Sequence, residues 1–399
     1  MADRNMTMKK RIFSLIMFFL IMAAACSNAA GPAVTDGLIY DETDNTWASC
    51  DEDLAELVGI MKNECSKSPE IKGAYILATD DRIVFIGGIN SVDTSGKKVD
   101  AYTTYEIGSM TKAFTATAVF QLCEQGKLSL DDTLDRFFPE FDYGNEITIR
   151  HLLHMQSGLR KDYVREKTFL DEQGLPDIEE FRRYYYDGFT DEELLAMLFS
   201  DPLEFKPGTK FLYSNTGYNL LAMIIEKITE KSYGEYIQEN IFAVCGMDHS
   251  SSMATGDVTS IPEFVPRENA SAPYDAPYEI VDTLYMQLIK PQRGVGDIHS
   301  CVADMLAFDR ALIGGKLINA VSLAEMFRMD KGYGCGWVQD SRYRSIYYHG
   351  GETYIYKGYN LYGSTKKYGN IYLIQLHPAV AGDQYSNECM MEIIRAVMK

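Results

Sequence analysis

A serine and a lysine, Ser109 and Lys112, are the residues of this chain whose types and spacing point most directly to chemistry. Apolar residues after them, including Phe114 and Phe120, recur with a helical period, and Gly108 permits a turn before them. Ser109 is therefore predicted at a helix N-terminus, where free backbone N–H groups favour developing negative charge. Lys112 then lies one turn further on the same face. In apolar surroundings a lysine can lose its proton and act as the base for the serine.

The same Ser-x-x-Lys spacing occurs at three serines, Ser95, Ser109 and Ser364. Two of these lie in polar stretches that contain glycine and lysine and are followed by no apolar helix, so they are predicted to form turns. Only the setting of Ser109 favours a nucleophile.

The composition indicates a globular protein with an acidic surface. The 399 residues are 46% hydrophobic and 12% aromatic, which excludes a disordered chain. A formal net charge of −19 argues against nucleic acid as a partner, because phosphate binding needs concentrated Lys and Arg.

The cysteines do not form a metal-binding pattern. There is no Cys-x-x-Cys pair, and the spacings fit no zinc site, so no metal is expected. Most are predicted to be buried free thiols, and a disulfide is the alternative for a protein outside the cytoplasm. The eight are Cys26, Cys50, Cys65, Cys123, Cys245, Cys301, Cys335 and Cys389.

Residues 1–25 have the pattern of a targeting segment. A positive region at 9–11 precedes an apolar run over 12–22, which is too short for a comfortable membrane span. Small residues and Cys26 follow, as in a bacterial lipoprotein signal that lipidates the cysteine, although Ala23 stands where leucine is usual. An ordinary secretory cleavage is the alternative. Both predict export, and two or more acyl chains on Cys26 would anchor the protein to the membrane.

The rest of the chain divides by pattern. Residues 26–52 are polar and are predicted to be a tether, and 53–64 to be a helix. Residues 73–87 are predicted to form a hairpin that turns at Asp80 and Asp81. Residues 127–290 have mainly helical and loop patterns, with a helix over 148–158 and a capping box at 190–193.

Strand patterns return near the end of the chain. They cover 333–338, 345–349, 357–362 and 370–376, and a helix is predicted over 388–398. Strands at both ends with helices between them indicate one sheet built from the two termini. We therefore predict one domain over 53–399, with an α/β part at 53–126 and 291–399 and a helical region at 127–290.

Two further strings complete a candidate site. Tyr213-Ser214-Asn215 lies in a longer string that begins at Phe205, and His349-Gly350-Gly351 lies on a late strand. In this order, with Ser109 and Lys112, they resemble the serine β-lactamase and penicillin-binding protein superfamily. The branch most similar is that of class C β-lactamases, DD-peptidases and related esterases. The resemblance covers about residues 55–375.

The resemblance implies a β-lactamase/transpeptidase-like α/β (α+β) fold, with an antiparallel sheet flanked by helices and an all-helical region. It implies an acyl-enzyme on Ser109, with Lys112 and Tyr213 sharing the proton transfers and the phenol made basic by nearby positive charge. Asn215 would hold Lys112 or a substrate amide. The N–H groups of Ser109 and Glu352 would form the oxyanion hole, and no cofactor is implied.

The sequence departs from the family pattern around His349. This histidine replaces the lysine of the family's Lys-Thr-Gly triad, as in esterase-like and peptidase-like members, and Gly350 and Gly351 follow it. The expected glycine and aromatic, Gly358 and Tyr359, arrive later than usual. We expect an enlarged edge of the substrate cleft there.

These features predict an exported serine hydrolase, lipid-anchored on the outer face of the bacterial cell membrane through Cys26 or else secreted. The substrate would be a small-molecule ester or amide, with a peptidoglycan D-amino-acid peptide (DD-carboxypeptidase-like activity) fitting the location. Alternatives are a β-lactamase or carboxylesterase, and a non-catalytic penicillin-binding-like sensor or binding lipoprotein. Nothing in the sequence indicates the oligomeric state.

Overall fold

The computed structural model describes residues 35, 37–69, 71–92, 96–163, 190–252, 292–353, 356–378 and 385–398. The predicted signal segment and Cys26 lie outside them. The chain divides into the units Met1–Gly37 and Leu38–Lys399, and all that follows concerns the second unit.

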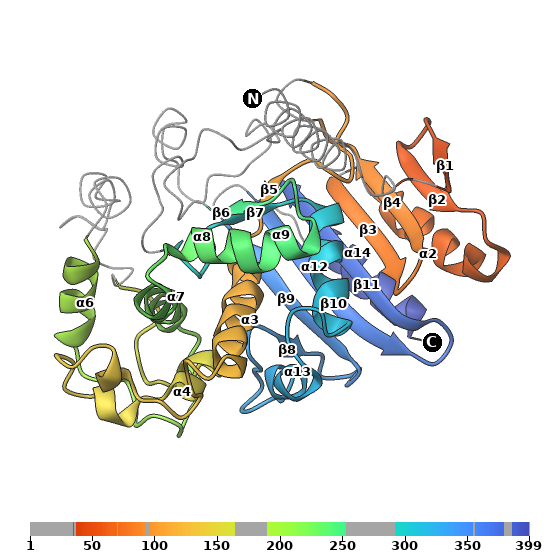
Figure 1. The fold of residues 1–399 in the computed structure, drawn as a ribbon. Coiled ribbons are helices and arrows are strands. Elements are labelled where there is room, and N and C mark those ends of the chain that lie inside the picture. Colours follow the sequence, from red (N-terminus) through yellow and green to blue (C-terminus); the bar gives the residue numbers. More distant parts are fainter. Residues whose placement is uncertain are drawn as a thin grey trace, which may run out of the picture. The chain divides into compact units, whose positions relative to one another are not determined.

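An eight-stranded antiparallel sheet forms the centre of this unit, in the order β1-β2-β4-β3-β11-β10-β9-β8 (Figure 1). Its middle joins the two ends of the chain, because β3 pairs with β11 from Ala74 opposite Leu376 to Thr79 opposite Ile371. The strands are β1 Leu38–Asp41, β2 Thr46–Ser49, β3 Gly73–Thr79, β4 Ile83–Ile89, β8 Val338–Gln339, β9 Ile346–Glu352, β10 Tyr356–Thr365 and β11 Gly369–Pro378.

A second, three-stranded sheet lies beside the first, in the order β5-β7-β6. It comprises β5 Tyr105–Glu106, β6 Ser251–Ser252 and β7 Ile298–Ser300. Tyr105 pairs with Ser300, so this sheet fixes the chain just before the Ser109 turn to a segment far along the sequence.

Helices cover both faces of the large sheet. On one face α2 and α14 pack together over an apolar cluster that includes Leu57, Phe85 and Ile393. On the other face α12 packs on β3 and β11, and Phe308 of α12 stacks on Phe114 of α3 with ring centroids 3.9 Å apart. These helices are α2 Ala55–Cys65, α3 Thr111–Glu124, α12 Val302–Ile313, α13 Ala320–Met326 and α14 Tyr385–Val397.

The predicted helical region contains the remaining α-helices. They are α4 Ile149–Leu153, α6 Asp191–Phe199, α7 Asn215–Thr229, α8 Tyr233–Ile237 and α9 Ala243–Cys245. Short turns of other helix types are η1 Glu52–Leu54, η2 Gly108–Met110, η3 Leu134–Arg136, η4 Gly144–Glu146 and η6 Gln238–Phe242. The predicted capping box is present, since the Thr190 side chain accepts from the N–H of Glu193.

The fold class is confirmed: this is a mixed α/β arrangement of the β-lactamase/transpeptidase type. The hairpin turning at residues 80 and 81 is also confirmed. Three local expectations differ. Residues 38–49, inside the predicted tether, form β1 and β2, where Trp47 pairs with Ile86 of β4. The helix predicted over 148–158 ends at Leu153, because Met155 turns to a positive φ of 57°.

The third difference concerns the strand predicted over 333–338. Here only Val338 belongs to a strand, β8, and the segment before it turns back on itself. Gly336 adopts a φ of +80°, and a Cβ on it would lie 2.7 Å from the Cα of Ala113. A glycine turn packed against α3 therefore replaces the strand, and it carries Tyr333 toward β9.

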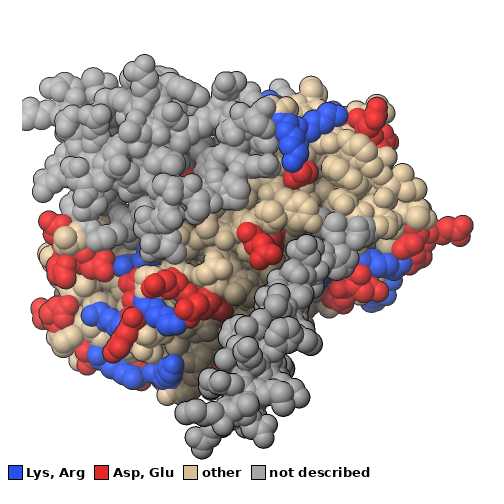
Figure 2. Space-filling model, turned by 45° about the horizontal axis from the view of Figure 1, so that its top comes forward, with Lys and Arg blue, Asp and Glu red and all other residues tan. Residues whose placement is uncertain are grey.

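The surface agrees with the charge of the sequence. On the face drawn in Figure 2, the Lys and Arg side chains of the described residues lie among Asp and Glu side chains and form no continuous basic surface. In the described part of the chain, no helix is both long and apolar enough to cross a membrane.

Candidate active site

The turn that carries Ser109 depends on a glycine. Gly108 has a φ of +51°, a conformation that side chains disfavour. A Cβ at Gly108 would also lie 2.9 Å from the backbone nitrogen of Glu352 on β9. The turn therefore brings Ser109 to the start of α3 and directly against β9, next to the edge strand β8.

Lys112 is completely buried and lies within bonding distance of the nucleophile. Its Nζ is 2.9 Å from Oγ of Ser109 and donates to the carbonyl of Val295 at 3.1 Å. Burial lowers the pKa of Lys112 to about 7, with Asp162 raising it and Lys161 lowering it. A substantial neutral fraction near pH 7 gives the amine a lone pair that can accept the serine proton.

Tyr213 lies on the other side of this pair. Lys112 Nζ is 5.0 Å from the centre of its ring, and its hydroxyl interacts with Ser109 by a hydrogen bond. Burial raises the pKa of Tyr213 above its ordinary value, and Asp162 acts in the same direction. The resting side chain is therefore a neutral phenol. It can relay a proton, but its pKa is shifted in the direction opposite to the one that the sequence analysis expected from nearby positive charge.

Asn215 begins α7 two residues after Tyr213. Its Nδ2 donates to Oδ1 of Asp162 at 2.7 Å. Its Oδ1 is buried and has no hydrogen-bond partner among the described residues. Of the two expected roles, holding Lys112 corresponds to no bond here, since Lys112 uses Ser109 and Val295. The free oxygen fits the other role, accepting from a substrate amide.

His349 is held by its own strand and by a tyrosine. Its Nδ1 lies 2.7 Å from the carbonyl of Gly350, which can only accept, so Nδ1 carries the proton. Nε2 then accepts from the hydroxyl of Tyr333 at 3.0 Å. Burial, followed by the charge of Lys112, lowers the pKa of His349 to about 3. The imidazole is therefore neutral and supplies none of the positive charge of the lysine it replaces.

The backbone of β9 passes the Ser109 turn where the second oxyanion donor is expected. A Cβ on Gly351 would lie 1.9 Å from the carbonyl oxygen of Ile107, so this strand runs tightly against the residue before the Ser109 turn. Thr353 donates its backbone N–H to Tyr356 of β10. Because neighbouring N–H groups on a strand point to opposite sides, the N–H of Glu352 points away from β10, toward Gly108.

The side chain of Glu352 plays no part in this donor. It is exposed and pairs with Lys357 at 3.1 Å on the neighbouring strand. Only the backbone of Glu352 faces the nucleophile.

A second layer of polar contacts supports β9 and was not expected from the sequence. Asn360 pairs in register with His349 and donates to Oδ1 of Asp309 on α12 at 2.8 Å. Burial raises the pKa of Asp309 to about 8, so its carboxyl group is mostly protonated at pH 7. Tyr333, Asp162 and Val295 were also assigned no role. No short motif marks them, because they reach the site through turns.

The structure thus brings Ser109, Lys112 and Tyr213 together, with His349 next to them. The rings of Tyr213 and His349 are 6.3 Å apart. Ser364, one of the other two serines with the same spacing, lies within β10, and Ser95 lies outside the described residues. Within the described ranges no cluster of His, Cys, Asp and Glu could hold a metal ion.

Comparison with known proteins places this site in a family. The family model described as Beta-lactamase matches residues 61–387. Penicillin-binding protein 4* of Bacillus subtilis (strain 168) is 30% identical over 286 residues, which are 67% of this chain and 60% of that protein. The chain therefore spans about three fifths of the length of that curated relative.

Solved structures show the same fold. A penicillin binding protein from Bacillus halodurans superimposes with a TM-score of 0.64 at 22% identity, covering 85% of this chain and 99% of that one. The D-amino acid amidase from Ochrobactrum anthropi SV3, complexed with D-phenylalanine, gives 0.65 at 21% identity, with 87% and 99% covered. The chain belongs to the beta-lactamase family, whose fold serves serine hydrolases.

Proposed function

We propose that this protein is an exported serine hydrolase that forms an acyl-enzyme on Ser109 with an ester or amide substrate. The observation that carries the proposal is the buried Lys112 amine, 2.9 Å from Oγ of Ser109, whose pKa burial lowers to about 7. A protein that only binds a ligand needs no base beside a nucleophile, whereas acyl transfer does.

In the proposed first step, Ser109 Oγ attacks the substrate carbonyl and passes its proton to Lys112. The backbone N–H groups of Ser109 and Glu352 stabilise the oxyanion, at about 3 kcal/mol per donor. The phenol of Tyr213 relays the proton to the leaving group, whose departure breaks the ester or amide bond. Water then releases the acyl group by the reverse proton path.

The substrate we propose is a D-amino-acid peptide, amide or ester, and a cell-wall stem peptide is one such molecule. The similarity to penicillin-binding proteins and to a D-amino acid amidase supports this class. The unpartnered oxygen of Asn215 supports recognition of a substrate N–H. A β-lactam would find no cation at the position of His349, so β-lactamase activity ranks below amide or ester hydrolysis.

We further propose that the protein is anchored to the outer face of the cell membrane through a lipid on Cys26. The positive, apolar and small-residue pattern of residues 1–25 supports this. Metabolic labelling with an alkyne fatty acid tests it: we expect label on the wild type and none on Cys26→Ser. An unlabelled wild type that is found in the medium would favour secretory cleavage instead.

The activity is tested by exposing the full chain to a fluorophosphonate and measuring intact mass. We expect one adduct, mapped to Ser109, and none on Ser109→Ala. A screen then compares D-amino-acid amides, peptides ending in D-alanine, carboxylic esters and β-lactams. An intact, folded protein that takes no adduct would contradict the proposal and support the sensor or binding lipoprotein.

A further inference from the structure

Two cysteines face each other across the two helices that cover the face of the sheet opposite α12. Cys65 is the last residue of α2, and Cys389 lies in the first half of α14. Both are 4% exposed and belong to the same apolar cluster. Their thiols are near enough to interact by a hydrogen bond, and this contact, together with burial, raises the pKa of Cys65.

We propose that Cys65 and Cys389 form a disulfide that ties α2 to α14 once the protein meets an oxidising compartment. The inference does not depend on the chemistry proposed at Ser109, but it rests on the export proposed above. No described cysteine is bonded in the structure as it stands, so the pair is in its reduced form.

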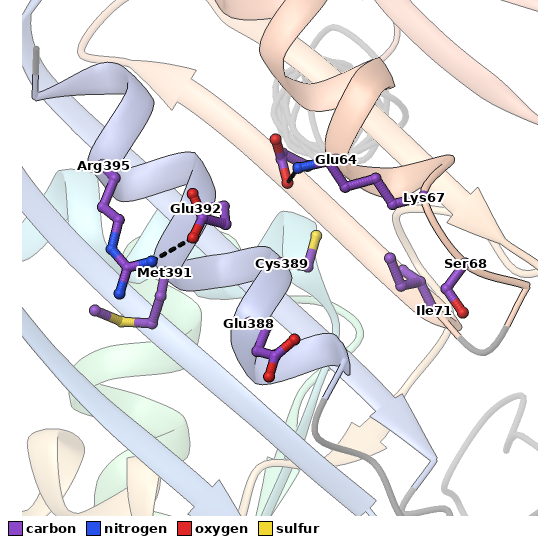
Figure 3. Close-up of a pocket in the computed structure, with 9 residues that line it drawn as sticks. All are labelled: Glu64, Lys67, Ser68, Ile71, Glu388, Cys389, Met391, Glu392 and Arg395. Atoms are coloured by element: carbon purple, nitrogen blue, oxygen red, sulfur yellow. Dashed lines mark hydrogen bonds and ion pairs between the residues drawn. The ribbon is translucent and has the colours of Figure 1, made fainter.

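A cavity gives an oxidant access to one of the two thiols. It has a volume of about 660 Å³ and lies between the end of α2 and α14, and Cys389 is part of its wall. Figure 3 draws the Cys389 sulfur turned toward the end of α2 that carries Glu64. Cys65 is not among the residues that line it.

The charges around the cavity are mixed. Glu64, Glu388 and Glu392 line it together with Lys67 and Arg395. Lys67 is bonded to Glu64 at 2.6 Å and also acts electrostatically on Cys389. Cys389 is part of the cavity wall and Cys65 is not, which makes Cys389 the thiol that an oxidant reaches first and therefore the attacking thiol.

The reaction is a thiol–disulfide exchange, and its oxidant is the disulfide form of a thiol–disulfide carrier. The Cys389 thiolate attacks one sulfur of that disulfide, whose S–S bond breaks and releases one thiol. Cys65 then attacks the Cys389 sulfur and releases the second thiol. The protein loses two protons and two electrons, and the oxidant gains them.

The bond closes a very long loop. Cys65 and Cys389 are more than about 300 residues apart in the sequence. A cross-link over such a length strongly restricts the unfolded chain. The bridge would also fix the first helix of the catalytic unit to its last, over the apolar cluster. We expect the oxidised form to have a melting temperature higher by about 5 °C.

The test uses the full chain, reduced, freed of reductant and exposed to oxidised glutathione. Free thiols are then blocked with N-ethylmaleimide, and the denatured protein is mapped by mass spectrometry. We expect one linked peptide pair containing Cys65 and Cys389, about 2 Da lighter than the two thiol peptides together. Recovery of both residues as blocked thiols, or linkage of either to another cysteine, would overturn the proposal.

Single variants separate the two roles. In Cys65→Ser, glutathione should remain attached to Cys389, because the resolving thiol is gone. In Cys389→Ser, Cys65 should stay unmodified, and neither variant should gain thermal stability on oxidation. Cys245→Ser removes a thiol outside the pair and should form the bridge like the wild type. Mapping of the wild type decides the question even if a serine variant fails to fold.

Discussion

The two faces of the large sheet differ in the kind of side chain that they bury. The face covered by α2 and α14 buries an apolar cluster, and the charged side chains between these helices, such as Glu64 and Lys67, line the cavity beside it. The face toward α3 and α12 buries Lys112, His349, Asn360 and Asp309. Neighbouring residues of β10 point to opposite faces of the sheet. Asn360 donates a hydrogen bond to Asp309 of α12, while Leu361 belongs to the apolar cluster.

This difference separates stability from chemistry. Apolar burial stabilises a fold by about 25 cal/mol per Å², whereas a buried amine or an unpaired amide oxygen destabilises it. The α3 face holds groups whose pKa values are displaced by that burial, and displaced values are what acyl transfer needs. Substitutions on the two faces should therefore act on different observables.

The largest effect is expected from Lys112→Met, which keeps the volume of the side chain and removes its amine. The rate of Ser109 acylation should fall by about 10²–10⁴-fold. In the wild type the rate should rise with pH through about 7, where Lys112 loses its proton, and the variant should lose that dependence. Second-order rate constants for the reaction of Ser109 with the fluorophosphonate, measured between pH 5 and 10, give the fall in rate and the pH dependence. A wild-type profile that rises only near the pKa of free lysine, about 10.4, would exclude Lys112 as the base.

Leu57→Ala on α2 is expected to lower stability and to leave the acylation rate unchanged. Leu57 is fully buried in the apolar cluster, and its truncation should lower the free energy of unfolding by about 2–5 kcal/mol. Chemical denaturation measures this loss. The acylation rate per folded molecule should stay within about 2-fold of the wild type. A large drop in that rate would show that the two faces are coupled.

Lys112 also makes stability depend on pH. Its pKa is about 7 in the folded protein and near 10.5 when unfolded, so between these values the unfolded chain binds more protons. Wild-type stability should therefore rise with pH over that window, relative to Lys112→Met, by roughly a few kcal/mol. Denaturation of both proteins at pH 7, 8.5 and 10 isolates the contribution. If the difference in stability between the two proteins were the same at all three pH values, Lys112 would keep its proton in the folded protein.

The smallest effect is expected from Tyr333→Phe, which removes the hydroxyl that bonds to His349. Losing one such hydrogen bond corresponds to about 0.5–1.5 kcal/mol, so acylation should slow by about 3–10-fold. The melting temperature should fall by a few degrees, since the ring remains in place but the buried Nε2 of His349 loses its donor. Phe211→Leu, at an exposed neighbour of Tyr333, is the control and should alter the rate less.

What the sequence predicted well is what short stretches determine. The Ser109 turn, the hairpin at residues 80 and 81 and the capping box at Thr190 each depend on residues a few positions apart. The roles of the site residues stay predictions, but the helix spacing placed Lys112 beside Ser109 correctly.

What the sequence did not predict depends on contacts between distant segments. The strand β2 forms because Trp47 pairs with Ile86 of β4, although the residues around Trp47 in the sequence are polar. Tyr333 reaches His349 through the Gly336 turn, which fits only against Ala113 of α3. The raised pKa of Tyr213 follows from burial in the assembled site. No local pattern contains this information.

The pairing of β3 with β11 has a consequence for when the surroundings of Ser109 are completed during synthesis of the chain. A nascent chain that has reached α3 already contains Ser109 and Lys112, but β9 and the partner strand of β3 are still unmade. Contacts over such separations form late and slowly. The surroundings of Ser109 are therefore incomplete until the last strands have emerged.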